Sequence, residues 1–313
     1  MCQDIEFPTS PAQFANMQIV DPLAYPTMPP ACSAPIVNYA IPDEAAADAS
    51  SLLDLLPACD KTTIWNVDFA RLNMSQVIER ADRIIQSGLC RYFITANLNY
   101  VMLTHQVPEL AAVNAGADAI IADGFPIVLR SKLHRQPLES RVAGSDMIIE
   151  LAKLSSLRGY RLFLLGAAPG VARRAADHLC SLFPQLQIAG CLSPSFGSWS
   201  AEEQAEVFAR IQQTRTDILL VAFGQPKGER WIHQHHQQLG IPLSIQLGAS
   251  FDFLAGTAKR APTTWQRLGC EWLYRSLSEP RRLGPRYLSN IRFLCRCLLS
   301  DALSSVRQRT RAQ

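Results

Sequence analysis

The sequence predicts an α/β fold: a largely parallel, Rossmann-like sheet flanked by helices and followed by a helical C-terminal appendage. From about Lys61 onward, short apolar segments alternate with longer amphipathic stretches, which is the pattern of βα units. The apolar residues in the short segments are consecutive rather than alternating, as expected when helices cover both faces of a parallel sheet. From Pro262 the sequence becomes helical in pattern and rich in arginine, which predicts the appendage.

The individual elements follow from these apolar runs and periodicities. The predicted strands are Thr63–Val67, Arg91–Ala96, Ala117–Ala122, Arg161–Gly166, Gln187–Cys191, Asp217–Phe223 and Pro242–Leu247. The predicted helices between them are Ser75–Ser87, Asn99–Ala115, Pro126–His134, Ser145–Leu157, Pro169–Leu182, Ala201–Gln213 and Lys227–Leu239. In the C-terminal part, apolar residues recur near one helical face, which predicts helices over Trp265–Leu277 and Gly284–Leu303.

The two ends of the chain differ sharply in charge. Residues 1–60 contain no Lys or Arg, eight acidic residues and nine of the twenty prolines, which indicates a disordered acidic extension with at most a short helix at Ala45–Leu56. We expect residues 61–260 to form the α/β domain and residues 261–313 to form a basic helical appendage. The nine arginines of the last 41 residues imply an anionic partner: a phosphorylated substrate, a membrane surface or nucleic acid.

The cysteines and the hydropathy indicate a cytoplasmic protein. The nine cysteines are scattered and include no C-x-x-C pair, so we interpret them as reduced thiols. No basic segment followed by an apolar stretch is present at the N-terminus, so no signal peptide is expected. No apolar run reaches the roughly 18 residues of a transmembrane helix. Contact with a membrane is therefore expected to be peripheral.

The loops that follow the predicted strands are the expected ligand site, because open parallel sheets bind ligands at the carboxyl ends of their strands. The five loops follow Ile94, Ala122, Leu165, Ala222 and Leu247. Four of these five loops contain glycine, including Gly166 and Gly224. Glycine lets backbone N–H groups approach phosphate, and a helix that follows adds its positive end. The alternative is that each glycine merely ends a strand. Four such loops on one edge favour phosphate binding.

Polar side chains on the same edge are the candidate catalytic groups. Asp123 follows an apolar strand and can act as a general base, or it can cap the helix that begins near Pro126. Thr95 and Asn97 can orient a sugar hydroxyl or cap the next helix. Arg141 lies in a loop from which its guanidinium can bind a diphosphate in a bidentate manner.

Several other classes of site are disfavoured. The P-loop signature is absent, and Gly166–Gly170 lacks the complete G-x-G-x-x-G pattern of nicotinamide enzymes. No D-x-D pair is present to hold a divalent metal against a sugar nucleotide. We interpret His233, His235 and His236 as the solvated face of a helix rather than as a metal site. No cofactor and no metal are therefore expected.

Two functions of other classes are compatible with an α/β fold and can be tested by assays. One is a nicotinamide-dependent oxidoreductase, which needs the missing glycine fingerprint. The other is a non-catalytic nucleotide-binding module whose tail binds nucleic acid. That tail would need stacking aromatic residues among its basic ones, and after Tyr274 it contains only Tyr287 and Phe293. We therefore expect no nucleic-acid partner.

Ordered sequence blocks over about residues 61–295 resemble the WecG/TagA/CpsF family of bacterial glycosyltransferases. The blocks are T-A-N at Thr95–Asn97, A-D-G at Ala122–Gly124, R-V-A-G-S-D at Arg141–Asp146, F-L-L-G at Phe163–Gly166, F-G-Q-P-K at Phe223–Lys227, F-D-F-L-A-G at Phe251–Gly256, K-R-A-P at Lys259–Pro262 and E-W-L-Y-R…E-P-R-R at Glu271–Arg282. The resemblance implies an inverting hexosyltransferase that uses a UDP-sugar donor and a polyprenyl-diphosphate-linked saccharide acceptor. Such an enzyme would make surface or exopolysaccharide precursors at the inner face of the plasma membrane, in contact with its anionic surface. A homo-oligomer is left open.

The resemblance also assigns roles to individual residues. Asp123 matches the proposed catalytic base, and Thr95 and Asn97 match a substrate-positioning pair. Arg141 and Gln225 match two further polar positions of the active site. The basic appendage is thought to close over the donor diphosphate and touch the membrane, and the candidate arginines there are Arg275, Arg281 and Arg282.

The chain departs from the family pattern at two places. The family often has T-P-N-P where this chain has Thr95–Leu98 as T-A-N-L, and it often has P-K-Q-E where this chain has Pro226–Glu229 as P-K-G-E. These changes leave the sugar open among N-acetylmannosamine, its uronic acid and glucose.

Overall fold

The structure of the protein, a computed structural model, describes residues 56–194, 199–267 and 269–311. The expected acidic extension and the short helix expected at Ala45–Leu56 lie outside the described residues, apart from the last few positions. All described residues belong to one unit of the chain, Asp48–Gln313.

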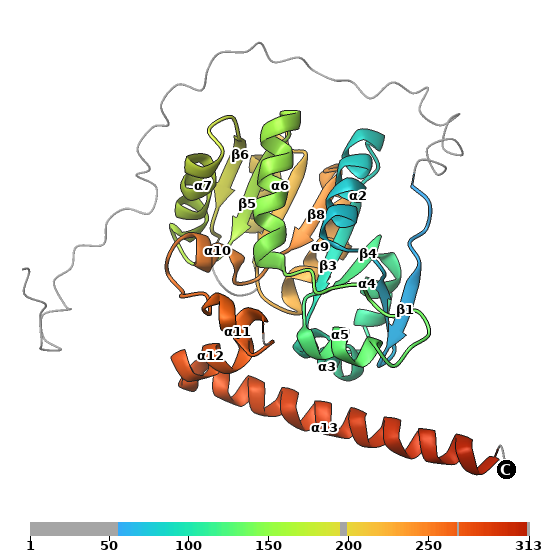
Figure 1. The fold of residues 1–313 in the computed structure, drawn as a ribbon. Helices are drawn as coiled ribbons and strands as arrows, with labels where there is room; N and C mark the ends of the chain where they lie inside the picture. The colour runs from blue at the N-terminus through green and yellow to red at the C-terminus, as the bar shows by residue number, and fades with distance from the viewer. Residues whose placement is uncertain (1–55, 195–198, 268, 312–313) are drawn as a thin grey trace, which may run out of the picture. The chain divides into compact units, whose positions relative to one another are not determined.

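A parallel sheet of six strands forms the centre of this unit (Figure 1). Its strands are β3 (Arg91–Ala96), β4 (Ala119–Ala122), β5 (Arg161–Gly166), β6 (Gln187–Leu192), β7 (Ile218–Ala222) and β8 (Leu243–Gln246). Their order is β4-β3-β8-β7-β5-β6, and every pairing is parallel. The chain runs from β3 outward to β4 and then crosses to β5 on the other side of β8 and β7. This reversal creates the topological switch point at which such sheets bind ligands, and the α/β prediction is confirmed.

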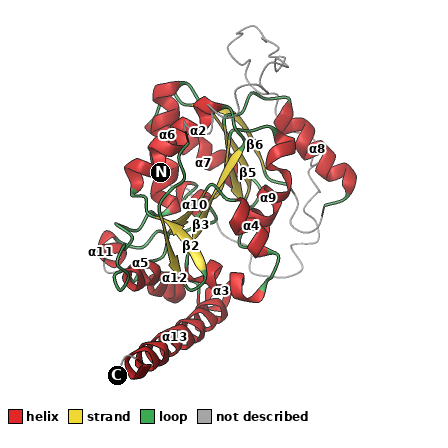
Figure 2. Cartoon of the chain, turned by 90° about the vertical axis from the view of Figure 1, so that its right-hand side faces the viewer, coloured by secondary structure: helices red, strands yellow, loops and turns green. Residues whose placement is uncertain are grey.

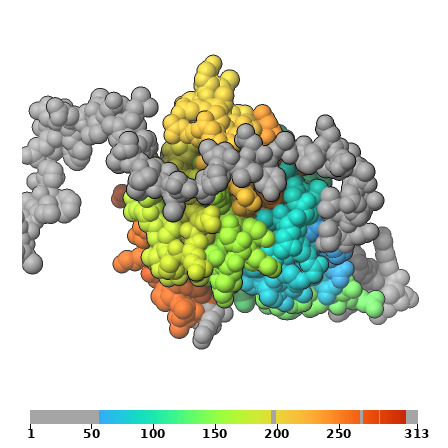
Figure 3. All heavy atoms as spheres, turned by 90° about the horizontal axis from the view of Figure 1, so that it is seen from above, coloured from blue at the N-terminus to red at the C-terminus, as the bar shows by residue number. Residues whose placement is uncertain are grey.

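Helices cover both faces of the sheet, which explains the uninterrupted apolar strands. On one face lie α2 (Met74–Ser87), α6 (Gly144–Arg158), α7 (Val171–Leu182) and α10 (Ser250–Leu254). On the other lie α3 (Leu98–Gln106), α4 (Leu110–Gly116), α5 (Phe125–Ser131), α8 (Ala201–Gln212) and α9 (Lys227–Leu239). Neighbouring strand residues such as Phe93 and Ile94 point into opposite cores. Figure 3 shows the side chains of α2, α6 and α7 packed beside one another.

The strand predicted at Thr63–Val67 is wrong, because these residues span a turn. The structure has a separate antiparallel hairpin of β1 (Lys61–Ile64) and β2 (Val67–Ala70). Trp65 and Asn66 form its two-residue connection and both have positive φ, 47° and 62°. Two-residue hairpin turns of this kind usually contain glycine. A tryptophan at the first position hid the turn and made two short strands look like one.

Two predicted helices are each divided in the structure. Asn99–Ala115 becomes α3 and α4, because Pro108 has no N–H to donate and disfavours helical backbone at the residue before it. Trp265–Leu277 becomes α11 (Thr263–Arg267) and α12 (Glu271–Ser278). Gly269 has a φ of 71° between them, a left-handed conformation that ends a helix. The short helix α10 had not been expected.

The histidines of α9 are packed against α8 and the sheet, so their interpretation as a solvated face is wrong. His235 is 5% exposed and lies between the rings of Phe208 and Trp231. His233 Nδ1 lies 2.9 Å from the hydroxyl of Tyr92. Burial lowers the pKa of His235 below its ordinary value. The covered imidazole of His235 therefore packs between α8 and α9 as a neutral side chain, while His233 contacts the sheet through Tyr92.

A long helix, α13 (Pro280–Arg311), completes the appendage and extends beyond the expected Gly284–Leu303 (Figures 1 and 2). It packs against α3. Near its end Asp301 accepts hydrogen bonds from the indole of Trp65 (3.3 Å) and from Nε of Arg130 (2.7 Å). Phe293 lies edge-on to the ring of Trp65. No described helix is long and apolar enough to span a membrane.

Candidate active site

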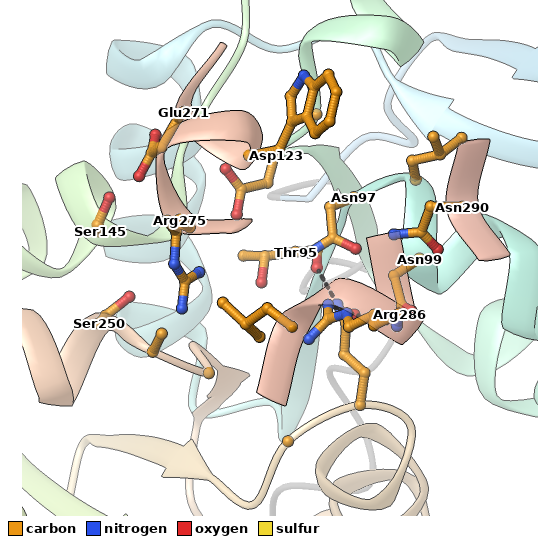
Figure 4. A pocket seen from close by; sticks show the side chains of 18 of the residues that line it. Thr95, Asn97, Asn99, Asp123, Ser145, Ser250, Glu271, Arg275, Arg286 and Asn290 are labelled. Atoms are coloured by element: carbon orange, nitrogen blue, oxygen red, sulfur yellow. Dashed lines mark hydrogen bonds between the residues drawn. The ribbon is translucent and has the colours of Figure 1, made fainter. Parts of the chain in front are cut away.

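A cavity of about 530 Å³ lies between the carboxyl ends of the central strands and the C-terminal appendage (Figure 4). The sheet contributes the residues that follow β3, β4, β7 and β8. The appendage contributes the turn before α12, α12 itself and the first half of α13. The catalytic edge predicted from the strand ends is therefore where the structure places the cavity.

Asp123 directly follows β4 and lines this cavity. Burial raises the pKa of its carboxyl to about 7, and the negative charges of Glu271 and Asp146 add to the increase. Arg141 and a hydrogen bond from the N–H of Gly144 lower the pKa in part. The alternative role, a helix cap, does not apply, because α5 is preceded by Gly124 and has no side-chain cap. A carboxyl with a pKa near 7 can exchange a proton at neutral pH.

Thr95 and Asn97 lie at the end of β3. The structure shows which of them caps the next helix, the alternative to a role in binding a sugar. Asn97 is the N-cap of α3, where its Oδ1 accepts from the backbone N–H of Tyr100 (3.2 Å). Thr95 makes no cap; it is 5% exposed and its hydroxyl donates to the carbonyl of Gln246 (2.8 Å). Both residues line the cavity. Asn97 therefore offers its amide nitrogen to a ligand, and Thr95 offers hydroxyl lone pairs.

Gln225 joins three elements around the cavity. Its Oε1 accepts from Asn99 Nδ2 on α3 (3.2 Å) and from a guanidinium nitrogen of Arg286 on α13 (3.3 Å). Its Nε2 donates to the carbonyl of Thr95 (3.3 Å). The loop reaches this position through Gly224, with a φ of 77°, and a cis peptide bond before Pro226. The amide of Gln225 thus ties the end of β7 to β3 and to the appendage.

A buried carboxyl, Glu229, lies behind this loop in the first turn of α9. It is 1% exposed, and burial raises its pKa to about 8, while Arg286 and Gln225 lower it in part. At neutral pH this side chain is mostly protonated. Sequence analysis did not single it out, because a glutamate in the first turn of a helix is usually exposed.

Gly228 explains one departure from the family pattern. A Cβ at this position would overlap the side-chain amide of Gln246, which is 1% exposed. Gln246 of β8 therefore fills the space that a larger residue 228 would need. Gln246 itself lines the cavity, so the glycine at position 228 leaves room for a polar side chain there.

The arginines divide into those that line the cavity and those that do not. Arg275 lines it and lies over the ring of Phe253, 5.2 Å from its centroid. Arg281 is exposed and outside the cavity lining, and the side chain of Arg282 lies outside the described residues. Arg286 lines the cavity and had not been selected. Its helical spacing with Leu283 and Asn290 on one face of α13 is the signal that could have found it.

The two glycines chosen as phosphate-binding candidates differ in position. Gly224 lines the cavity. Gly166 lies one residue outside the lining, with a φ of 106°, and a Cβ there would come within 2.8 Å of the carbonyl oxygen of Ala222. Its position allows the end of β5 to pack closely on β7, so that Ala167 and Ala168 reach the cavity.

Arg141 was expected to face a diphosphate, and the structure pairs it with the appendage. A guanidinium nitrogen of Arg141 lies 3.2 Å from a carboxyl oxygen of Glu271 at the start of α12. Both residues line the cavity. Glu271 had not been considered as a site residue. Among residues 56–194, 199–267 and 269–311, no group of three or more His, Cys, Asp or Glu side chains could hold a metal ion.

Comparison with known proteins places the chain in a family. The family described as "Glycosyl transferase WecG/TagA/CpsF family" matches residues 62–308. A Bacillus spizizenii protein is 34% identical over 61% of this chain and 72% of its own length. A Staphylococcus aureus protein is 33% identical over 72% of this chain and 87% of its own length. Both are named N-acetylglucosaminyldiphosphoundecaprenol N-acetyl-beta-D-mannosaminyltransferase. From the strand-end cavity and this match over most of its length, the chain belongs to the WecG/TagA/CpsF family of glycosyltransferases.

Proposed function

We propose that this chain is an inverting hexosyltransferase that moves N-acetylmannosamine from a UDP donor to a polyprenyl-diphosphate-linked saccharide. The names of the relatives support both the sugar and the acceptor class. The product would be a lipid-linked precursor of a surface polysaccharide. The uronic acid of the same sugar and glucose are the alternative donors, because the chain departs from the common family pattern at Ala96, Leu98 and Gly228.

The observation that carries this proposal is the position of Asp123. A carboxyl with a pKa near 7 lies in the same cavity as Arg275 and Arg286. In the proposed reaction Asp123 takes the proton of an acceptor hydroxyl while the oxygen attacks the anomeric carbon. The bond from that carbon to the UDP β-phosphate oxygen breaks, and UDP leaves with the bonding electrons. Attack opposite to the leaving group inverts the anomeric centre.

The negative charge that develops on UDP requires stabilisation, usually the largest catalytic contribution in such a site. Arg275 and Arg286 are the cavity arginines in the appendage that can supply it, together with N–H groups of the loop at Gly224. Thr95, Asn97 and Gln225 would orient the sugar, since each presents polar atoms to the cavity. This division of roles assigns the base to the sheet and the diphosphate to the appendage.

A transfer assay tests the proposal directly. The full chain is incubated with radiolabelled UDP-N-acetylmannosamine and a short-chain lipid-diphosphate-linked N-acetylglucosamine, and the lipid product is counted. Parallel arms use the uronic acid donor, UDP-glucose, NADH oxidation and RNA retention. Transfer that is lost in Asp123→Asn supports the proposal. NADH oxidation or RNA retention without any sugar transfer would replace it with one of the rival functions.

We also propose that α13 brings the enzyme to an anionic membrane at the cytoplasmic face, where UDP-sugars are available. Apolar side chains of α13 are exposed at Leu288, Ile291, Leu298, Leu299 and Leu303. Arg292 and Arg296 are exposed among them, and this mixture is typical of interfacial helices. Sedimentation with phosphatidylglycerol vesicles should fall when Leu298, Leu299 and Leu303 become Gln, while turnover of a soluble short-chain acceptor persists.

A further inference from the structure

The start of α12 is held against the segment that follows the catalytic strand β4. Gly269 lies in the turn before α12 and is buried, with a φ of 71°. A Cβ at Gly269 would overlap the ring of Phe125, which lies two positions after Asp123. Because only glycine permits this approach, the contact sets the first residue of α12, Glu271, close to the site of the base.

Glu271 therefore reaches the cavity beside Asp123, and Figure 4 shows the two carboxyl groups at the same end of it. Glu271 accepts from Arg141 over 3.2 Å, and the two side chains are only 16% and 21% exposed. Among the charged side chains around Asp123, Arg141 has the largest effect on its pKa, and it favours the charged form. The appendage thus supplies both a second negative charge near Asp123 and a partner that occupies Arg141.

Other charged groups also face Asp123 and must be counted. Asp146, in the first turn of α6, disfavours its charged form. Arg260, from the segment between α10 and α11, pairs with Asp146 at 2.6 Å and adds a second positive charge to the cluster. The N–H of Gly144 donates to Asp123. Apart from Arg260, these groups belong to the sheet side of the cavity, and Glu271 is the acidic member that comes from the appendage.

We propose that Glu271 is a positioning residue of the transfer reaction: it holds Arg141 and places a second carboxylate beside Asp123 when α12 is docked. This inference rests on the proposed function of Asp123 as the base. With α12 docked, Asp123 holds a proton more strongly and is a more effective acceptor for the hydroxyl proton. With α12 displaced, Arg141 is free to pair with Asp123 and weakens it as a base.

The pH dependence of turnover tests this role. For the full chain, kcat/KM is measured between pH 5 and 9 with saturating acceptor, for wild type, Glu271→Gln, Glu271→Asp and Glu150→Gln. In the wild type kcat/KM should fall at low pH as Asp123 becomes protonated, which is the acidic limb of the rate profile. In Glu271→Gln this limb should move to lower pH by about one unit, because one neighbouring negative charge is lost and Arg141 is released. Glu271→Asp should lie between the two. Glu150, on the exposed side of α6 and outside the cavity, is the charge-matched control and should leave the limb unmoved.

An independent variant covers the case in which Glu271→Gln fails to fold. Gly269→Ala disturbs the contact with Phe125 without changing any charge, and it should move the acidic limb in the same direction. A limb that stays in place or moves to higher pH in the folded variants overturns the inference, even if turnover falls. If the wild type transfers no sugar, or if Asp123→Asn keeps the limb, it is instead the proposed function that fails.

Discussion

The hydroxyl of Thr95 donates its proton to the main-chain carbonyl of Gln246, 2.8 Å away on the neighbouring strand. A hydroxyl has one proton and two lone pairs, so Thr95 can only accept a hydrogen bond from a substrate. Thr95→Ser should keep kcat/KM within a few-fold of wild type, whereas Thr95→Val should lower it about tenfold or more, by the loss of one such bond. Steady-state kinetics with varied donor measure the difference.

Thr104→Val provides the matched control for that loss. The Thr104 hydroxyl also donates to a main-chain carbonyl, that of Tyr100 within α3, but Thr104 lies outside the cavity lining. Its replacement should leave kcat/KM unchanged at a similar cost in stability. Equal kinetic losses in Thr104→Val and Thr95→Val would mean that Thr95 only supports the fold.

Asp123 should impose an acidic limb on the rate profile. A base acts in its deprotonated form, so kcat/KM should rise as the pH increases through about 7 and then level off. Asp123→Asn should lower the rate about 100- to 10,000-fold and remove the limb, because the amide has no basic lone pair. Calorimetric titration with UDP should show binding close to wild type. Turnover near the wild-type level in this variant would transfer the role of base to another group.

How far the sequence predicts this molecule can be seen in β3, β5 and α9. These elements have the predicted bounds Arg91–Ala96, Arg161–Gly166 and Lys227–Leu239. The strands are buried between helices, so their apolar runs begin and end with the strand itself. Helix α9 begins after Pro226 and ends before Gly240, which has left-handed backbone, and both signals are local in the sequence. Elements with local boundaries are the ones that sequence analysis locates.

The missed parts of the site depend on contacts between distant segments. Nothing in the spacing of Glu271 indicates that it meets Arg141, 130 positions earlier. Arg281 rather than Arg286 was assigned to the cavity, because the sequence does not show which face of α13 points toward it. The rotation of α13 about its axis depends on its contacts with distant segments, such as those of Asp301 with Trp65 and Arg130, which are 236 and 171 positions earlier. The strand-end residues Asp123 and Thr95 can be predicted because parallel strands bring their ends together by topology alone, whereas Gln225 was selected only from the family resemblance.

Glu229 should make stability depend on pH in a direction opposite to that of a paired carboxylate. Its folded pKa of about 8 lies above the unfolded value near 4.5, so the folded state binds this proton more tightly. Stability from this group is present below about pH 4.5 and is lost as the pH rises through 8. Glu229→Gln cannot ionise and escapes the loss. The difference in melting temperature between Glu229→Gln and wild type should grow in favour of the variant from pH 5 to pH 9.

The control for Glu229 is Glu150→Gln, at an exposed side chain of α6. Its melting temperature should follow that of the wild type at every pH, which separates the effect of burial from that of net charge. Asp123 loses stability in the same pH range, but it is present in all three proteins and cancels from the comparison. A constant difference between Glu229→Gln and wild type would show that Glu229 is already ionised at pH 5.

Arg286 and Arg281 lie less than two turns apart on α13 and form a matched pair for testing the appendage. Arg286 lines the cavity and donates to Gln225 at 3.3 Å, whereas Arg281 is exposed outside it. A charge-assisted hydrogen bond is worth about 1.5–3 kcal/mol, or roughly 10- to 100-fold in binding. Arg286→Gln should therefore raise the KM for the UDP-sugar by about that factor with a soluble acceptor. Arg281→Gln removes the same charge from the same helix and should leave that KM unchanged. Equal effects of the two changes would indicate that the appendage acts through its total charge, and the donor diphosphate would then have to be bound by Arg275 and the strand-end loops.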